Sequence, residues 1–374
     1  MVNACLTGKS AGCPAFLPVG RGGEESRPCN RIYISRKSRP VGGELHSPAF
    51  LDRVYLVFEE EQMTTPKEVK TVAVIGNGII GHGLAQVFAV ANYNVRMIGR
   101  NPKSLSAAVG KIKESLKRFQ THKILNAKDS KAAIGRIVTS THLEDAASAE
   151  LVIEAVTEDL PLKHQIFERL DQICPLPAVL ASSSGQPASK LVARVKNRER
   201  VVAAHFWYPP QLIPLVEVCA GPETAPDVVP WICDVLRKAG KEPVVMNREI
   251  PGFIGNRLQF ALLREAWALW AAGVATAEAI DAVVRNSFGR RVAITGPIES
   301  ADVGGLDTMH AFAAFLFPDI DAGAQPPAAI ANLVKEGHRG LPSGRGVYDW
   351  SKRDGQALVA ERMEELFRHL KRKK

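Results

Sequence analysis

A histidine and a glutamate, both in apolar surroundings, are the first residues of this chain that could perform acid–base chemistry. His205 follows the apolar run Val201–Ala204, and Glu217 lies 12 residues later within the apolar segment Leu215–Val218. Because burying an unpaired carboxylate is unfavourable, Glu217 needs a partner, and a histidine within reach would supply one. The contact would fix the imidazole tautomer and raise its basicity. The oxidation of an alcohol requires such a base near neutral pH, since a proton and a hydride must both leave the substrate. A purely structural pair is the alternative.

Three glycines after another apolar run could bring the backbone close to a phosphate. Gly76, Gly78 and Gly81 form the pattern G-x-G-x-x-G directly after Thr71–Ile75, and apolar residues at helical spacing follow. In a dinucleotide-binding unit the first glycine permits a tight turn, the second lets the backbone approach a pyrophosphate, and the third lets helix and strand pack closely. The N–H groups and positive dipole end of the new helix then face the phosphates. A structural glycine turn is the alternative to the cofactor site that we assign to Gly76, Gly78, Ile79, Ile80 and Gly81.

The residues after the second expected strand, Val95–Ile98, bear on the identity of the cofactor. An NAD site usually has Asp or Glu at this position to bind the ribose hydroxyls, and Gly99 stands there instead. The missing carboxylate removes a group that would repel a 2′-phosphate, and Arg100 could bind one. On electrostatics alone these residues favour NADP; the cofactor that we expect is NAD, with NADP kept open. Arg100 could equally be a solvated turn residue.

The elements that must position these residues alternate between strands and helices. Asn101 and Pro102 suit a helix start, and apolar residues at helical spacing follow them to Phe119. Ligands of open parallel sheets bind outside the carboxyl ends of the strands, where Glu158, Ser184 and His205 are expected. We predict an α/β fold, with a Rossmann-type doubly wound sheet domain over residues 67–250 and a smaller all-α C-terminal domain over residues 251–350. Further strands are expected at Arg136–Val138, Leu151–Val156, Pro177–Leu180 and Val201–Ala204.

The remaining segments suggest an assembly and two flanking regions. The helix opened by Pro251 is apolar nearly all round, so we expect it to be buried on several sides, partly by a second subunit of a homodimer. Residues 1–66 are rich in Gly, Pro, Arg and Ser, which predicts a disordered extension, or a true start at Met63. Residues 351–374 are expected to form a charged amphipathic surface helix and a tail.

Composition excludes several classes of function. The net charge is +9, but basic residues are scattered apart from Lys371–Lys374, so no nucleic-acid partner is expected. The six cysteines form neither a C-x-x-C pair nor a zinc-type spacing, which predicts no metal site and reduced thiols in a cytoplasmic protein. The most apolar long segment, Leu258–Ala275, carries Arg264 and Glu265 at its middle, so no membrane span is expected.

Several motifs in one order resemble the 3-hydroxyacyl-CoA dehydrogenase family. They follow the glycine turn as VIEAVTEDLPLKHQIF, an SSSG loop, AAHFWYPPQLIPLVEV and PGFIGNRL, and the likeness covers roughly Lys70 to Trp350. Within the family, HFWYPPQLIPLVEV followed by GPETAP is similar to the branch of L-gulonate 3-dehydrogenase (lambda-crystallin) and L-carnitine dehydrogenase. The resemblance implies NAD(P)-dependent oxidation of a 3-hydroxyacyl-CoA to the 3-oxo product, as in fatty acid metabolism.

The resemblance also implies roles for single residues. His205 matches the family's catalytic base and Glu217 the residue that orients it. Ser184 matches the serine that binds the reacting oxygen if one residue is deleted from the loop; without the gap Gly185 falls there, and the serines could instead cap a helix. Asn256 matches the substrate-orienting asparagine, with an ordinary polar helix residue as the alternative. Glu158 and Lys163 match cofactor-contacting positions, with exposed charges at a helix start as the alternative.

One residue departs from the family pattern and leaves the substrate open. Tyr208 stands where the family usually has Asn, which puts the usual substrate geometry in doubt. A dehydrogenase of a small hydroxy acid such as L-gulonate or L-carnitine is the enzymatic alternative, favoured by PPQLIPLVEV. The closing GRGVYDW segment favours acyl-CoA. A cofactor-binding protein of the crystallin type without activity is the third possibility.

Overall fold

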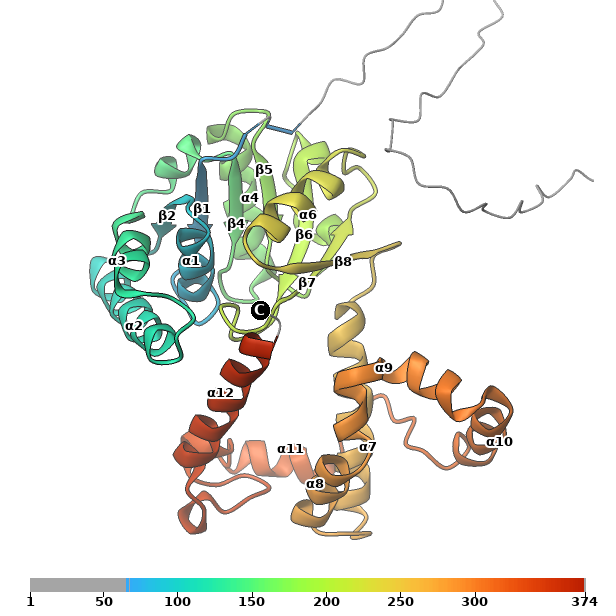
Figure 1. The fold of residues 1–374 in the computed structure, drawn as a ribbon. Helices are drawn as coiled ribbons and strands as arrows, with labels where there is room; N and C mark the ends of the chain where they lie inside the picture. Colours follow the sequence, from blue (N-terminus) through green and yellow to red (C-terminus); the bar gives the residue numbers. More distant parts are fainter. Residues whose placement is uncertain (1–64, 67, 373–374) are drawn as a thin grey trace, which may run out of the picture. The chain divides into compact units, whose positions relative to one another are not determined.

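The computed structural model describes residues 65–66 and 68–372 (Figure 1). The predicted extension over residues 1–66 therefore lies outside the described residues, except for Thr65 and Pro66. Both of these contact helix α6 (Val228–Lys238) or its start, because Thr65 donates to Asp227 and the Trp231 indole donates to the Pro66 carbonyl.

A sheet of eight strands carries the described part of residues 67–250, in the order β3-β2-β1-β4-β5-β6-β7-β8. The first six in spatial order are parallel to one another, β7 runs antiparallel to β6, and β8 runs parallel to β7. The strands are β1 Thr71–Ile75, β2 Asn94–Ile98, β3 Ile137–Ser140, β4 Leu151–Glu154, β5 Val179–Ser182, β6 Val201–Phe206, β7 Leu215–Ala220 and β8 Glu242–Met246.

Helices cover both faces of this sheet, as the doubly wound prediction requires. Alternate residues of β1 point to opposite sides, with Val72 and Val74 in one apolar core and Ala73 and Ile75 in the other. The first core is completed by α1 (Gly81–Val90), α2 (Pro102–Thr121), α3 (Ala127–Gly135) and α6. The second is completed by the 3₁₀ helix η1 (Leu143–Ser148), α4 (Leu160–Ile173) and α5 (Ala188–Leu191). The Rossmann-type fold predicted from the sequence is therefore confirmed.

Helix α2 shows how local sequence sets these elements. Asn101 caps it by accepting the Ser104 backbone N–H at 2.8 Å, and Pro102 occupies its first turn. Its buried residues recur at helical spacing and end at Phe119, so the predicted apolar face is confirmed. Two details differ from expectation: the helix expected to start at residues 143–145 is a 3₁₀ helix, and β6 extends to Phe206, one residue beyond His205.

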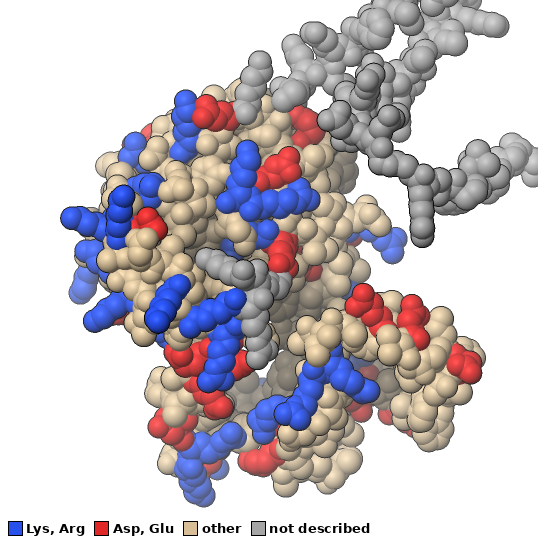
Figure 2. All heavy atoms as spheres, viewed as in Figure 1, with Lys and Arg blue, Asp and Glu red and all other residues tan. Residues whose placement is uncertain are grey.

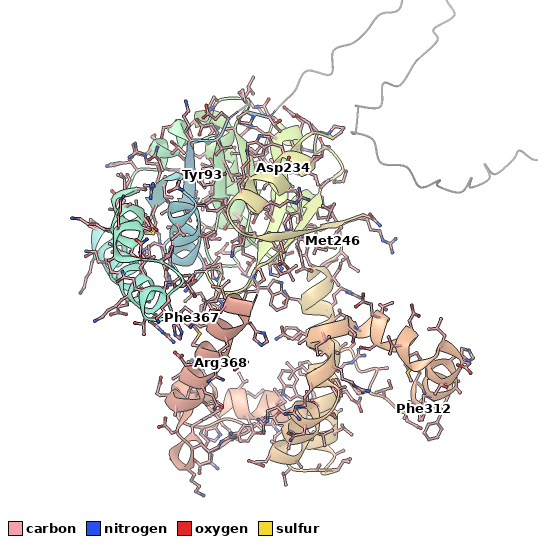
Figure 3. All side chains as sticks on the ribbon, in the orientation of Figure 1. Tyr93, Asp234, Met246, Phe312, Phe367 and Arg368 are labelled. Carbon is pink, nitrogen blue, oxygen red and sulfur yellow. The ribbon has the colours of Figure 1, made fainter. Side chains whose placement is uncertain are left out.

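The residues after β8 are helical, as predicted, but pack less tightly than expected. They form α7 (Phe253–Ala271), α8 (Ala277–Asn286), α9 (Gly289–Gly304), α10 (Leu306–Leu316) and α11 (Ala328–Lys335). The expectation that the first of these is buried on several sides is wrong for the single chain, because Phe253 is its only buried residue. Leu258, Phe260 and Leu262 are exposed on it, and Phe312 on α10 is exposed as well (Figure 3).

The last helix, α12 (Gly355–Arg372), follows the short 3₁₀ turn η4 (Trp350–Lys352). It was expected at the surface, yet its apolar face packs back against α2, where Phe367 is 2% exposed (Figure 3). Elsewhere on the face drawn in Figure 2, Lys and Arg side chains are spread out with Asp and Glu between them.

Candidate active site

His205 and Glu217 are direct partners across the antiparallel pair β6–β7. Because they stand directly opposite each other in this pair, both side chains leave the same face of the sheet. His205 Nδ1 lies 2.8 Å from Glu217 Oε2. The two residues are 9% and 1% exposed. The pairing expected from burial is thus present in the structure.

The Glu217 carboxylate is held by further donors. The Trp207 indole donates to Oε2 at 3.1 Å, and the backbone N–H groups of Ile254 and Gly255, in the first turn of α7, donate to Oε1 at 2.9 Å each. Burial alone would raise the pKa of Glu217, but the hydrogen bonds from His205, Gly255 and Trp207 outweigh it and lower that pKa. Glu217 is therefore ionised at neutral pH.

An ionised Glu217 fixes the tautomer of the neutral His205 ring. A carboxylate only accepts hydrogen bonds, so Nδ1 must carry the proton and Nε2 becomes the acceptor nitrogen. The ring is also held from the side, because Phe253 stacks on it with centroids 5.3 Å apart and Trp207 meets it at 5.7 Å. This arrangement presents one nitrogen as a base.

A cavity of about 640 Å³ lies against this ring. It is bounded by the glycine turn at Ile80, by the loops after β4 and β5, by the end of β6 and by the first turns of α7. The residues with polar side chains that line it are Glu158, Ser183, Gln186, His205, Trp207, Tyr208, Asn256 and Gln259. The predicted residues His205, Asn256 and Glu158 are therefore brought together.

Ser184 lies beside this cavity rather than on its wall. Ser184 is buried, its hydroxyl donates to Glu158 Oε2 at 2.7 Å, and its own Oγ accepts the Gln186 N–H at 3.0 Å. Among the described residues, the cavity wall at this loop is made by Ser183, Gly185 and Gln186. Gly185 faces Asn256, since a Cβ added there would lie 3.5 Å from the Asn256 amide nitrogen. The role of Ser184 toward the substrate stays a prediction.

Lys163 belongs to a buried network that the motifs did not suggest. Its ammonium is 2.7 Å from Glu154 Oε1 and 3.8 Å from Glu158 Oε1, and its side chain is 1% exposed. Glu154, fully buried, also accepts the Ser182 hydroxyl and the Val156 N–H. The alternative of an exposed charge at a helix start therefore fails for Lys163. A charged residue inside the strand run Leu151–Glu154 was the only sequence signal of this network.

The glycine turn has the shape that a dinucleotide requires. Gly76 has φ +107°, and a Cβ there would lie 2.5 Å from the Ala155 carbonyl oxygen. A Cβ at Gly81 would overlap the Gly76 carbonyl, whereas a Cβ at Gly78 meets no described atom within 4 Å. Gly76 and Gly81 thus make the close packing, and Gly78 leaves open space at the start of α1, where a pyrophosphate fits.

Family comparisons agree with this site. Residues 71–250 match the model of the NAD binding domain of 3-hydroxyacyl-CoA dehydrogenase, and residues 252–350 match the model of its C-terminal domain. This chain belongs to the 3-hydroxyacyl-CoA dehydrogenase family. It is therefore an NAD-dependent oxidoreductase of the 3-hydroxyacyl-CoA dehydrogenase type, and both the enzyme class and the cofactor NAD predicted from the sequence are confirmed.

Its relatives carry different substrates in their names. A probable 3-hydroxybutyryl-CoA dehydrogenase of Bacillus subtilis is 35% identical over 288 residues, which is 76% of this chain and 99% of that one. An L-carnitine dehydrogenase of Streptomyces griseus is 39% identical over 234 residues, 62% of this chain and 69% of its own. A solved structure of 5-formyl-3-hydroxy-2-methylpyridine 4-carboxylic acid 5-dehydrogenase, an NAD⁺-dependent dismutase, has a TM-score of 0.75 at 30% identity and covers 80% of this chain and 97% of its own. The family resemblance and its branch are thus confirmed, and the substrate is not fixed by them.

Two details of the dehydrogenase bear on its ligands. Gly99 packs against the glycine turn, where a Cβ would lie 2.5 Å from the Asn77 amide oxygen, and Arg100 beside it is exposed. Tyr208 is 53% exposed at the edge of the cavity, in place of the family's usual Asn. Among the described residues there is no cluster of three metal-ligand side chains. No helix in the described ranges is long and apolar enough to cross a membrane.

Proposed function

We propose that this dehydrogenase oxidises the 3-hydroxyl group of a 3-hydroxyacyl-CoA to the 3-oxo product. The observation that carries the proposal is the His205–Glu217 contact of 2.8 Å, which leaves Nε2 of a cavity-lining ring as the acceptor. His205 Nε2 takes the hydroxyl proton, and Glu217 stabilises the imidazolium that forms. Loss of the proton raises electron density on the carbinol carbon, from which hydride leaves.

The other predicted residues have supporting roles in this proposal. Asn256 binds the thioester carbonyl through its amide nitrogen, which faces Gly185. Ser184, which lies beside the cavity, would bind the reacting oxygen after a change of its χ1 rotamer releases the hydroxyl from Glu158 and turns it toward the cavity. The bound NAD supplies the hydride acceptor. Gly76, Gly78, Ile79, Ile80 and Gly81 would hold its pyrophosphate, and Arg100 and Glu158 would contact the rest of it. Lys163, buried behind Glu158, would act on the cofactor through that carboxylate.

A second substrate class is favoured by the lining of the cavity. Trp207 and Tyr208 place two aromatic rings there, and Glu158 adds a carboxylate. Aromatic faces with a nearby negative charge suit a quaternary ammonium group. A small hydroxy acid that carries such a group, as L-carnitine does, is therefore the alternative substrate. L-gulonate is a small hydroxy acid without the ammonium group.

Steady-state oxidation assays separate these possibilities. 3-Hydroxybutyryl-CoA, L-carnitine and L-gulonate are each assayed with NAD and with NADP, and the substrate with the highest kcat/KM identifies the class. His205→Gln is the matched control, which should lose turnover and keep NAD affinity. If the wild-type protein binds NAD and turns over none of the three, a crystallin-like protein without activity becomes the better description. Near-normal rates for His205→Gln would disprove the assigned base.

We also propose that the helices after β8 form the interface of a homodimer. Most of the exposed large apolar residues described in this region lie on three helices, and they include Ile254, Leu258, Phe260 and Leu262 on α7, Val292, Ile294, Ile298 and Val303 on α9, and Leu306, Phe312, Phe315 and Leu316 on α10. So many exposed large apolar side chains are unfavourable in water, and they indicate a protein contact. A second copy supplies a matching surface by two-fold symmetry. Light scattering should give twice the chain mass at micromolar concentration, and a monomer would contradict the proposal.

The thiols support a reducing compartment. Cys174, Cys219 and Cys233 are buried and unpaired among the described residues, and burial raises the pKa of Cys174 and Cys219 to about 11. We therefore propose a cytoplasmic location, and a place in fatty acid metabolism if the acyl-CoA substrate is confirmed.

A further inference from the structure

The segment between β6 and β7, residues 207–214, touches both the cavity and the C-terminal helix. We call it the connector. Its first residues, Trp207 and Tyr208, line the cavity. Its later residue Leu212 is 3% exposed and lies in an apolar cluster with Phe119 of α2 and Phe367 of α12. One short segment therefore joins the cavity wall to α12.

Phe367 is the centre of this cluster. Its ring meets the Phe119 ring edge-on with centroids 5.3 Å apart and stacks on His122 at 4.1 Å. Three residues earlier on α12, the Glu364 carboxylate accepts a hydrogen bond from Arg118 at 3.0 Å, and its other oxygen lies 3.2 Å from His122 Nε2. The ring and the carboxylate together fix α12 onto the end of α2, with Leu212 beneath it.

The connector is also held by hydrogen bonds that do not involve α12. The Lys241 ammonium donates to the Pro210 carbonyl and, at 3.0 Å, to the Ile213 carbonyl. The N–H groups of Leu212 and Ile213 donate to the Pro209 carbonyl within the connector itself. At the cavity end, the Trp207 indole donates to Glu217. The side chain of Leu212 has its apolar cover from Phe119 and Phe367.

We propose that Phe367 is a positioning residue of the active site, which acts through Leu212 to fix the connector and so the places of Trp207 and Tyr208. Helix α12 begins at Gly355, beyond residue 350, where the match to the family's C-terminal domain ends. For its activity readout the inference rests on the proposed function.

Removing the Phe367 ring opens a cavity beside Leu212 and allows the connector to shift. A displacement of about 1 Å in groups that position a substrate can lower the rate by up to about 100-fold. The substrate should be affected more than the cofactor, because Trp207 and Tyr208 line the cavity beside His205, whereas Ile80 is the residue of the glycine turn that lines it. A residue that only stabilised the fold would not separate the two ligands.

The test compares four single variants and one double variant of the full-length protein. Phe367→Ala removes the ring, and Phe367→Leu keeps an apolar contact with Leu212. Leu358→Ala is the matched control, since Leu358 lies on the same helix and is 40% exposed outside the cluster. Leu212→Ala removes the partner on the connector and is also combined with Phe367→Ala. Each variant is measured by hydrogen–deuterium exchange of residues 207–214 and by steady-state kinetics.

Phe367→Ala should exchange about tenfold faster within residues 207–214 and raise the KM for the hydroxy substrate about tenfold, with the KM for NAD within about twofold. Phe367→Leu should lie between Phe367→Ala and wild type, and Leu358→Ala should match wild type. The effects of Leu212→Ala and Phe367→Ala on exchange and on KM should not add in the double variant, because both substitutions remove the same contact.

Unchanged exchange and KM in Phe367→Ala, or faster exchange spread evenly over the whole domain, would overturn the inference. If Phe367→Ala does not fold, Phe367→Leu against Leu358→Ala decides between the same two outcomes. Exchange does not depend on turnover, so a wild-type protein without activity would disprove the proposed function and leave this inference to be judged by exchange alone.

Discussion

Glu217 lies opposite His205 at the place where the parallel order of the sheet ends, because β7 runs antiparallel to β6. One carboxylate oxygen holds the imidazole and the Trp207 indole, and the other holds the first turn of α7. The same side chain therefore sets the tautomer of the base and attaches the helix that carries Asn256. The position of the His205 ring and the position of the Asn256 amide are therefore linked through a single residue.

Glu217→Gln should lower kcat on the order of 100-fold, in the range that a general base contributes. The amide has one acceptor oxygen, so its NH₂ group faces either the His205 Nδ1–H or the N–H groups of α7. Either choice leaves donors unpaired and turns the ring or the helix. Steady-state kinetics measure the effect, and NAD affinity by fluorescence titration is the control that should stay unchanged.

The same substitution has a pH signature in stability. The pKa of Glu217 is lowered from 4.5 in the folded protein, so its charge contributes stability above that pH and loses it as the pH falls through the folded value. The difference in urea midpoint between wild type and Glu217→Gln should be constant near neutral pH and shrink below about pH 4.5. A difference that grows on acidification would contradict an ionised Glu217.

Lys163→Met should destabilise the protein by about 3–5 kcal/mol, because it leaves the buried Glu154 without its charged partner. Adding Glu154→Gln removes that charge and should restore part of the loss, so the two substitutions should not add. Urea unfolding measures both. Additive effects would mean that the 2.7 Å contact between Lys163 and Glu154 contributes little.

Much of this arrangement could be predicted from the sequence where one physical rule dominates. The face of α2 and the cap at Asn101 follow from helical period and turn chemistry, and the need of a buried Glu217 for a partner follows from the cost of burying a charge. The glycine turn follows from the space that a phosphate needs. Each of these depends on residues close in the sequence or on a single charge.

The remainder depends on partners that no local pattern specifies. The antiparallel direction of β7 is set by how the connector turns back, and the apolar run of the strand is the same in either direction. The hydrogen bond from the Ser184 hydroxyl to Glu158 joins two loops whose bonded residues are 26 positions apart in the sequence. The sequence of helix α7 predicts a buried helix because it is apolar nearly all round. In the single chain Phe253 is its only buried residue, because burial of the others requires a second surface.

Lys241→Met tests a buried ammonium behind the active site. Burial lowers the pKa of Lys241 to about 8, so the unfolded state binds more protons than the folded one between that pH and 10.5. Wild-type stability should therefore rise with pH across this window relative to Lys241→Met. The rise should be about 1.4 kcal/mol for each unit by which the pKa is lowered. Thermal unfolding between pH 7 and pH 10 measures the trend, and parallel curves for the two proteins would show that the ammonium is not buried in solution.

Gly78→Ala should separate cofactor binding from folding. A Cβ at Gly78 meets no described atom within 4 Å, so the unfolding midpoint should stay near that of wild type. The methyl group would occupy the space that the pyrophosphate needs, and the Kd for NAD should rise at least about tenfold, the equivalent of roughly 1.4 kcal/mol.

Gly110→Ala is the matched control, because Gly110 lies in α2 with the same open surroundings. It should raise stability by about 0.5–1 kcal/mol through helix propensity and leave NAD affinity unchanged. Calorimetric titration with NAD and urea unfolding measure the two effects, and unchanged NAD affinity in Gly78→Ala would remove this turn from the cofactor site.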